Sequence, residues 1–381
     1  MASKDRIIVS QTVVLSIPKG DAENKTVRAA DDDIDASICN TADSSKNKSV
    51  NLMMISCEEN PPYGPAKDTA IMFLELLCQA YERKKCSRSL VSSSTAESEM
   101  KREQQILAIN DDAIDLTISI AVYHAQLNDY PLATSEWFSY DGILIPGSLS
   151  AAYDTHIAWI EKLQSVIRIE IHEMKLKTVG VCFGHQCFAH AFGRHNEDDS
   201  REGQAIKCPT GSKAGRITCK LTQEGRQLLL DDNSGRSSME MLYTHGDMVH
   251  SLPEFAISLG GNADVPIEAC AYFSSKEEKI LFQKQQQHTT TTRNDGDEGN
   301  DNANATKVQP YAFTFQAHPE YISPTGFNTN YFNTVQAMED RGFITQQLSK
   351  EVCWDAKVNF EKVQDDSLNV MIAVASRLGW F

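Results

Sequence analysis

A cysteine stands at the point where a short apolar stretch gives way to a glycine-punctuated, helix-like stretch. Residues 178–193 read TVGVCFGHQCFAHAFG, with Cys182 between Gly180 and Gly184. A strand that turns sharply into a helix projects the intervening side chain above a sheet, and flanking glycines tolerate the crowding. This arrangement predicts a nucleophile elbow with cysteine in place of serine. The alternative is that Cys182 is a small buried core residue, which is common for cysteine.

The predicted helix adds two features that suit a nucleophile. Its positive end points at the Cys182 sulfur and favours the thiolate, which is the reactive form of cysteine. The backbone N–H of Phe183 lies in the first turn and is free to receive an oxyanion.

A base and an acid for such a thiolate occur together in FQAHPEY at residues 315–321. In an extended segment, side chains two residues apart point the same way, so His318 and Glu320 are expected to share a face. The carboxylate would then orient the imidazole, as a nucleophilic triad requires. A surface turn is the alternative for this stretch alone, but together with Cys182 it predicts a Cys-His-Glu triad.

A second loop could complete an oxyanion hole. The apolar run YDGILIPGS at residues 140–148 ends in Pro-Gly-Ser, and the N–H groups of Gly147 or Ser148 could bind the developing negative charge. An ordinary turn is the alternative for a Gly-Ser loop end.

These motifs follow strand-like runs that alternate with helical patterns. NLMMISC at residues 51–57, DLTISIAVYHA and KTVGVC are predicted strands, while residues 68–85 and 154–175 have helical spacing. Such alternation predicts an α/β fold with a mostly parallel central sheet covered by helices, whose active site lies beyond the carboxyl ends of the strands. Short strands and turns after residue 213 predict a small antiparallel side sheet, and two helices are expected near the end.

Polar stretches set the expected domain organisation. Residues 1–50 are predicted to be a loosely ordered leader, and residues 51–381 a single domain. Polar insertions are expected near 87–110 and at 284–308, the latter as a solvated loop inserted in a hairpin.

Composition narrows the partners. The 52 acidic and 36 basic residues give a net charge of −16, which disfavours nucleic acid and anionic membranes as partners. The sequence has no apolar run of the roughly 20 residues that a membrane helix needs and no convincing signal peptide, so a cytosolic location is expected. The ten cysteines form no CxxC pair and no ligand spacing with histidine, so we expect no metal site and no disulfide scaffold.

The three motifs, DGILIPGS, GVCFGHQ and AHPEY, occur in the order found in the class I glutamine amidotransferase domain, which residues 51–325 resemble. The resemblance implies a flavodoxin-like three-layer sandwich. It also implies Cys182 as nucleophile, His318 as general base and acid, and Glu320 as its orienting partner. Further roles that it implies are oxyanion binding by Gly147, Ser148 and Phe183, and lining of the γ-glutamyl pocket by Gln186.

Histidines and cysteines near these motifs are less specific. YTHGDMVHSLP at residues 243–253 resembles the family's segment near the amino-acid end of the substrate, so Thr244 and His245 are candidate binding residues. A structural, hydrogen-bonded histidine is the alternative for His245. Packing or surface polarity is the expected role of three others in the elbow helix: His185, Cys187 and His190.

The activity that the resemblance implies is hydrolysis or transfer at a γ-glutamyl amide of glutamine, glutathione or its conjugates, without a cofactor. No phosphate-binding loop of a synthetase follows Glu320, so the chain resembles the stand-alone branch that includes plant-type γ-glutamyl peptidases. The alternative is a glutaminase-like subunit, weakly active or inactive alone, that binds a separate synthetase partner. A DJ-1-type chaperone or deglycase is disfavoured because that family lacks the late His-Pro-Glu element.

Overall fold

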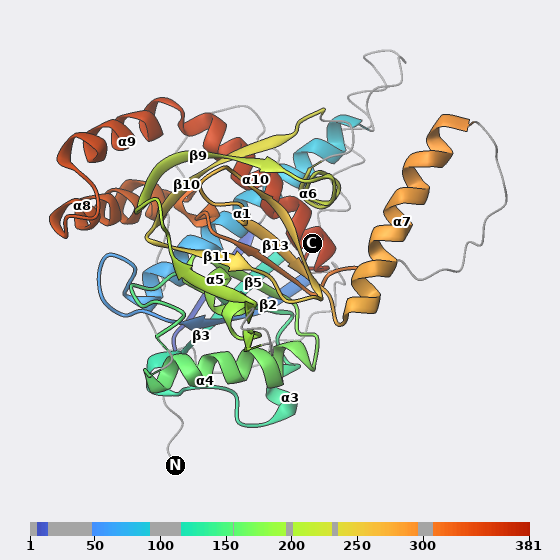
Figure 1. Ribbon diagram of the computed structural model, residues 1–381, viewed down its shortest axis with the longest axis horizontal. Helices are drawn as coiled ribbons and strands as arrows, with labels where there is room; N and C mark the ends of the chain where they lie inside the picture. Colours follow the sequence, from blue (N-terminus) through green and yellow to red (C-terminus); the bar gives the residue numbers. More distant parts are fainter. Residues whose placement is uncertain are drawn as a thin grey trace, which may run out of the picture.

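A computed structural model describes residues 6–13, 48–91, 116–154, 156–195, 201–230, 235–295 and 308–381. Its centre is a ten-stranded sheet with the order β1-β3-β2-β4-β5-β14-β13-β12-β9-β10 (Figure 1). The strands are β1 (Ile8–Val13), β2 (Lys48–Ser56), β3 (Leu116–His124), β4 (Gly142–Ile145), β5 (Thr178–Val181), β9 (Lys213–Leu221), β10 (Ser238–His245), β12 (Ala256–Gly261), β13 (Ala269–Tyr272) and β14 (Ala312–Phe315).

The middle of the sheet is parallel, as the alternating pattern predicts. Strands β3, β2, β4, β5 and β14 all run in the same direction, with Ile145 opposite Gly180 and Val181 opposite Phe315. Every residue of β4, β5 and β14 is buried, because helices cover both faces of the sheet here. The carboxyl ends of these three strands therefore meet at one edge.

The antiparallel strands continue this same sheet instead of forming most of a side sheet. Strand β13 pairs antiparallel with β14, and the ladder goes on through β12, β9 and β10. A separate antiparallel pair consists of β8 (Gln204–Lys207) and β11 (Asp247–Ser251), and a second of β6 (Arg194–His195) and β7 (Arg201–Glu202). The small side sheet is thus present as two-stranded pairs.

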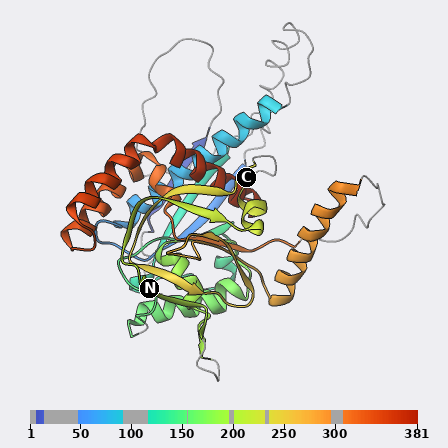
Figure 2. The ribbon, with the colours of Figure 1, turned by 45° about the horizontal axis from the view of Figure 1, so that its top comes forward.

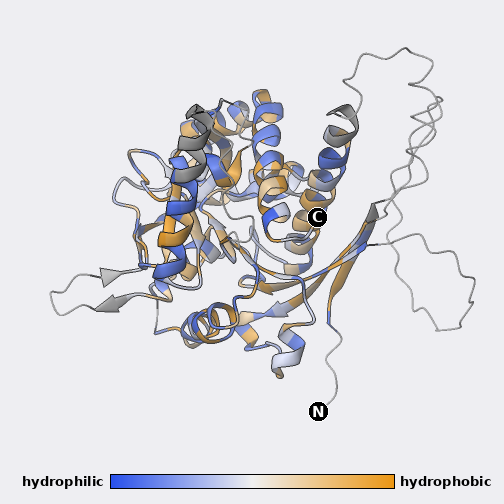
Figure 3. Cartoon of the chain, turned by 90° about the vertical axis from the view of Figure 1, so that its right-hand side faces the viewer, coloured by the Kyte–Doolittle hydropathy of each residue, from blue (hydrophilic) through white to orange (hydrophobic). Residues whose placement is uncertain are grey.

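Alternation along β2 divides the core into two layers. Leu52 and Met54 join one apolar cluster, whereas Met53 and Ile55 join the other. Helices α1 (Ala66–Val91), α6 (Gln223–Leu229) and α10 (Phe360–Arg377) cover the first face, and α4 (Ala158–Val166) and α5 (Phe183–His190) cover the second (Figures 1 and 2). Apolar and polar residues alternate along these helices in Figure 3, as expected when one side of a helix packs on a sheet. None of the helices that the structure describes has the length and apolar character needed to cross a membrane.

The last part of the chain forms three helices where two are expected: α8 (Phe332–Asp340), α9 (Gln346–Val358) and α10. The chain after α10 then returns to the sheet. The indole N–H of Trp380 donates to the carbonyl of Asp141 at 3.0 Å, and Trp380 is fully buried. Gly142 makes room for it, because a Cβ at this position would lie 2.4 Å from the indole. Trp380 therefore packs directly against the start of β4 and stabilises it.

Two of the expected boundaries differ from the structure. The region that was expected to be a loose leader contains β1, which pairs antiparallel with β3, and the first residues of β2; residues 14–47 lie outside the described residues. Helix α7 (Lys276–Asp295) occupies the first half of the insertion expected as a loop and projects from the body in Figures 1 and 2. Its Glu, Lys and Gln residues favour helix. Phe282 anchors the helix against Phe273, with 5.0 Å between the two ring centroids. Residues 92–115 and 296–307 also lie outside the described part.

Candidate active site

Cys182 occupies the sharp turn between β5 and α5. Its backbone has φ 51° and ψ −106°, a strained conformation for a residue other than glycine. The amide of Cys182 donates to the carbonyl of Phe315 at 2.8 Å, and its own carbonyl accepts from the amide of Gln186 at 3.0 Å. A Cβ on Gly184 would lie 2.1 Å from the carbonyl oxygen of Ile145, so only glycine lets α5 start this close to β4. The structure thus has the geometry of a nucleophile elbow.

His318 and Glu320 follow β14, the parallel neighbour of β5, and therefore reach the same edge of the sheet as Cys182. Nδ1 of His318 lies 2.7 Å from a carboxylate oxygen of Glu320. The two side chains meet through a 3-10 turn, η4 (Pro319–Ile322), and not through the extended segment that was expected. The turn brings the side chains together because it folds Glu320 back beneath the imidazole.

The electrostatics of His318 favour the imidazolium. Burial opposes its charge, but the negative charges of Glu320 and Cys182 outweigh burial and raise the pKa of His318 to about 10. Its Nε2 makes no hydrogen bond to nitrogen or oxygen in the described part of the chain, which leaves this atom for the Cys182 thiol. The Cys182 sulfur and the Glu320 carboxylate therefore both favour a charged His318 ring.

Two tyrosines stack on the His318 ring. Tyr321 stacks on it with 4.3 Å between ring centroids, and Tyr63 with 5.8 Å. The Tyr63 hydroxyl donates to the carbonyl of Thr244 at 2.8 Å, and the Thr244 hydroxyl lies 3.0 Å from that of Tyr321. The stacked rings and the Glu320 carboxylate thus together position the imidazole.

The loop after β4 lies against the triad. A Cβ on Gly147 would be 3.3 Å from Cε1 of His318, so the Gly147 backbone approaches the imidazole directly. The Ser148 hydroxyl and the Leu149 amide both donate to buried Glu58, at 3.5 and 3.4 Å, which anchors this loop. Phe183 is the first residue of α5, so its amide has no acceptor within the helix.

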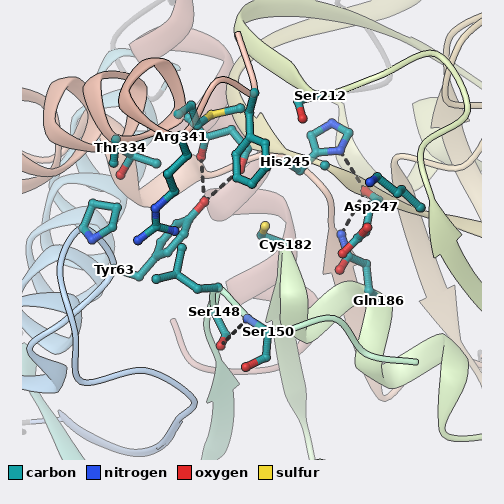
Figure 4. Close-up of a pocket in the computed structure, with 18 of the residues that line it drawn as sticks. Tyr63, Ser148, Ser150, Cys182, Gln186, Ser212, His245, Asp247, Thr334 and Arg341 are labelled. Carbon is teal, nitrogen blue, oxygen red and sulfur yellow. Dashed lines mark hydrogen bonds between the residues drawn. The ribbon is translucent and has the colours of Figure 1, made fainter. Parts of the chain in front are cut away.

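A cavity of about 250 Å³ opens above Cys182. In Figure 4, Gln186, His245 and Asp247 lie on one side of Cys182, here called the inner wall. Tyr63, Thr334 and Arg341 lie on the other side. With Met338 and Phe343 they form the outer wall. Of the predicted residues, the structure places the following along the cavity: Ser148, Cys182, Gln186, Thr244 and His245.

A family comparison tests what this geometry suggests. The family model for class I glutamine amidotransferases matches residues 104–338, which include Cys182, His318 and Glu320. The chain belongs to this family.

Relatives and solved structures agree with the amidotransferase assignment. A protein of Saccharomyces cerevisiae named for the glutamine amidotransferases is 32% identical over 36% of this chain and 50% of its own length. Gamma-glutamyl peptidase 5 of Arabidopsis thaliana is 29% identical over 35% of this chain and 49% of its own. The chain thus spans about half the length of these curated relatives. A glutamine amidotransferase structure from Thermotoga maritima has the same fold, with a TM-score of 0.50 and 10% identity over 86% of this chain and 97% of that one.

The inner wall of this amidotransferase is held by hydrogen bonds to backbone carbonyls. Nε2 of Gln186 donates to the carbonyl of Asp247 at 3.0 Å, and Nδ1 of His245 donates to the same carbonyl at 2.8 Å. Burial lowers the pKa of His245 to about 4, so its imidazole is neutral. Its Nε2 is buried without a hydrogen-bond partner among the described residues, which leaves an acceptor beside the cavity. His245 is therefore both hydrogen bonded and available to a ligand.

Histidines of the elbow helix lie elsewhere in the amidotransferase. His185 is buried, with its nitrogens 2.7 Å from the Thr314 hydroxyl and 3.3 Å from the Ile267 carbonyl. Nδ1 of His190 accepts from the amide of Ala205 at 3.1 Å. Neither histidine lines the cavity, nor does Cys187. The described residues include no group of three or more His, Cys, Asp or Glu side chains arranged to hold a metal ion.

The sequence analysis did not find the residues that complete the amidotransferase site. Tyr63 comes from the turn ENPPYGP, whose prolines signal a turn but not its destination. Arg341 lies directly after α8, where the chain pattern shows only a surface helix end. Asp247 is the exception, because it belongs to the THGD stretch that already suggested Thr244 and His245.

Proposed function

We propose that the protein is a cysteine-dependent hydrolase or transferase that acts on γ-glutamyl amide bonds. The observation that carries this proposal is that Cys182 lines the cavity from a strained elbow, with the buried His318–Glu320 pair beside it at the same edge of the sheet. The family membership supports the same class of reaction.

The first step is attack by the Cys182 thiolate on the side-chain carbonyl carbon of the γ-glutamyl group. The C–S bond forms as the carbonyl π electrons move to oxygen. The amides of Phe183 and the Gly147–Ser148 loop are placed to stabilise this oxyanion, because one starts a helix and the others lie against the triad.

The second step breaks the C–N bond. The His318 imidazolium donates its Nε2 proton to the departing nitrogen, and a γ-glutamyl thioester remains on Cys182. A water molecule then attacks the thioester while His318 accepts its proton, which releases glutamate and restores the thiolate. Replacement of water by another amine would give transfer instead of hydrolysis.

The inner wall suits the amino-acid end of such a substrate. Asp247 and Lys207 line the cavity and are paired across β11 and β8. A γ-glutamyl group carries an ammonium and a carboxylate on its α-carbon, and this pair offers the opposite charges. Burial raises the pKa of Asp247, while the Tyr153 hydroxyl donates to its carboxylate at 2.8 Å and so orients it.

The test is incubation of the purified protein with glutamine, glutathione and a glutathione S-conjugate in parallel. Free glutamate, ammonia and released dipeptide are followed by mass spectrometry, with Cys182→Ala as the control. Dipeptide release that requires Cys182 supports a γ-glutamyl peptidase. Ammonia from glutamine alone indicates a glutaminase, and the next experiment is then stimulation by a synthetase partner. Turnover retained in Cys182→Ala would exclude the mechanism.

A further inference from the structure

The outer wall of the cavity is a feature that the proposed reaction does not use. It is built from the end of α8 and the turn that follows, which place Met338, Arg341 and Phe343 along the cavity. The family match ends at residue 338, so Arg341 and Phe343 lie beyond the shared domain. This wall is therefore where the chain can differ from its family in substrate choice.

The position of the general acid shows which end of the substrate faces this wall. His318 has to protonate the departing amine, and it stacks on Tyr63. In Figure 4, Tyr63 and Arg341 lie together on one side of Cys182, whereas Gln186 and Asp247 lie on the other. The departing amine therefore leaves toward the outer wall, and the amino-acid end of the glutamyl group occupies the inner wall.

Arg341 brings an uncompensated positive charge to that side. Its backbone amide donates to the carbonyl of Ala337 at 3.2 Å, which fixes the residue at the end of α8. No carboxylate pairs with its guanidinium among residues 308–381 or in the rest of the described chain. Arg341 and Tyr63 both line the cavity, and in Figure 4 they lie on the same side of Cys182. A planar guanidinium in this setting matches a carboxylate, which accepts two parallel hydrogen bonds from it.

Two apolar side chains line the cavity on the same wall as Arg341. Met338 is buried, Phe343 has 56% of its surface exposed, and both line the cavity. A leaving group that consists of ammonia would touch none of them. A peptide or amino acid would cover this apolar surface with its body and place its terminal carboxylate within reach of the guanidinium.

We propose that Arg341 is a specificity-determining residue that binds a carboxylate on the leaving group, so that the preferred substrates are γ-glutamyl amino acids or peptides with a free carboxyl end. This assignment rests on the proposed function. It predicts that converting the substrate carboxylate to an amide and replacing Arg341 by a neutral residue each lower kcat/KM by the same factor. Making both changes together should lower kcat/KM no further than either change alone.

The experiment compares two matched substrate pairs, γ-glutamylglycine with its carboxamide and glutathione with its C-terminal carboxamide. The quantity measured is the ratio of kcat/KM for acid over amide in each pair. We expect a ratio of about ten for the protein in at least one pair, as for one charge-assisted hydrogen bond, and a ratio near one in Arg341→Gln. Arg341→Lys keeps the positive charge but lacks the paired N–H donors of the guanidinium, so its ratio should lie between those of the unaltered protein and Arg341→Gln.

Arg226→Gln is the matched control, since Arg226 is exposed on α6 and does not line the cavity. It removes the same charge from the molecule and should leave the ratio as it is. A ratio near one in both pairs for the unaltered protein overturns the assignment, as does a ratio that survives Arg341→Gln. Turnover without discrimination thus overturns only the role of Arg341, whereas the absence of Cys182-dependent turnover on every γ-glutamyl compound overturns the proposed function and this assignment with it.

Discussion

The two walls of the cavity are built in different ways. The inner wall stands on the sheet and on α5, and Gln186 and His245 are buried and bonded to a backbone carbonyl. The outer wall stands on a turn before α1 and on the end of α8, and Arg341 and Phe343 are exposed. Gln186 and His245 on the inner wall cannot move without breaking buried hydrogen bonds, whereas the exposed side chains of Arg341 and Phe343 on the outer wall can move freely.

This difference matches the two halves of a γ-glutamyl amide. The glutamyl half is the same in every substrate of the class, and a rigid, preorganised wall suits a group that does not vary. The amine half varies from ammonia to a peptide, and it faces side chains that can be exchanged at little cost in stability. Substrate range should therefore be altered at the outer wall, and binding of the shared half should be lost at the inner wall.

The largest effect is expected for the triad, which lies between the walls and serves both halves. Glu320→Gln keeps the shape but removes the charge that orients His318 and raises its pKa. We expect kcat to fall by roughly 10³ to 10⁴ for every substrate, as for the equivalent change in a serine protease triad. Because the pKa of His318 then falls, the alkaline limb of the pH profile of kcat/KM should move to lower pH.

Steady-state rates from pH 6 to 10 measure both effects of Glu320→Gln. The control is Glu361→Gln, which removes an exposed carboxylate from α10. If Glu320→Gln kept the kcat of the unaltered protein and the same alkaline limb in its pH profile of kcat/KM, Glu320 would not be the partner of His318.

The second prediction concerns Glu268, a buried carboxylate that lies behind the inner wall. Burial raises the pKa of Glu268 to about 7, and Tyr243 and Asn262 donate to its carboxylate at 3.3 and 2.7 Å. Its carbonyl accepts from the amide of Gln316, whose side chain in turn holds Gln186.

Since the pKa in the folded protein lies above the unfolded value, stability is fully present below the unfolded pKa and is lost as pH rises through about 7. The unaltered protein should lose about 3 kcal/mol of unfolding free energy over this window through Glu268. Urea unfolding at several pH values measures this change. In Glu268→Gln the loss of unfolding free energy between pH 4 and pH 8 should be smaller by about 3 kcal/mol. An equal loss in both proteins would contradict the raised pKa of Glu268.

The third prediction separates the walls by substrate. Asp247→Asn removes the charge from the inner wall while the backbone carbonyl of residue 247 still holds Gln186 and His245. We expect kcat/KM to fall by about ten to one hundredfold for glutamine, γ-glutamyl acids and their amides alike, because all share the ammonium group. A fall that depends on the leaving group would show that the two walls do not act on separate halves.

The smallest effect on kcat is expected for Tyr63, whose hydroxyl links the outer wall to Thr244. Tyr63→Phe removes the hydrogen bond to the Thr244 carbonyl but keeps the ring on His318. A loss of about 1 kcal/mol, or roughly fivefold in kcat, is expected from one hydrogen bond. Tyr63→Leu also removes the stacking and should lower kcat further, so equal losses in the two variants would show that the ring does not position His318.

Sequence reasoning predicts the geometry of the candidate site where that geometry depends on a few neighbouring residues. The elbow at Cys182, the His318–Glu320 pair and the parallel strands are local patterns, and strand order then brings them together. Tyr63 and Arg341 could not be predicted, because they reach the cavity only through packing between segments far apart in the chain. Tyr63, for example, bonds to Thr244, which lies 181 residues away.

The mistaken boundaries have a similar cause. The region with β1 looks too polar and interrupted to be ordered, but this edge strand is held by its pairing with β3 and by Val9, which is buried among the side chains described for residues 8–11. The first half of the polar insertion forms α7 because Phe282 gives its good helix formers a point of attachment. Composition averages over such anchors and cannot show them.

The buried indole of Trp380 has a consequence for how the protein is made. It fills space directly against Gly142 in β4, the strand whose end carries the Gly147–Ser148 loop. Ribosomes add about 5 to 20 residues per second, so residue 380 follows residue 142 by on the order of tens of seconds. During that interval the middle of the sheet lacks one of its core side chains. The catalytic sheet should therefore reach its final packing only after translation of this region has finished, and chaperones have time to bind it before then.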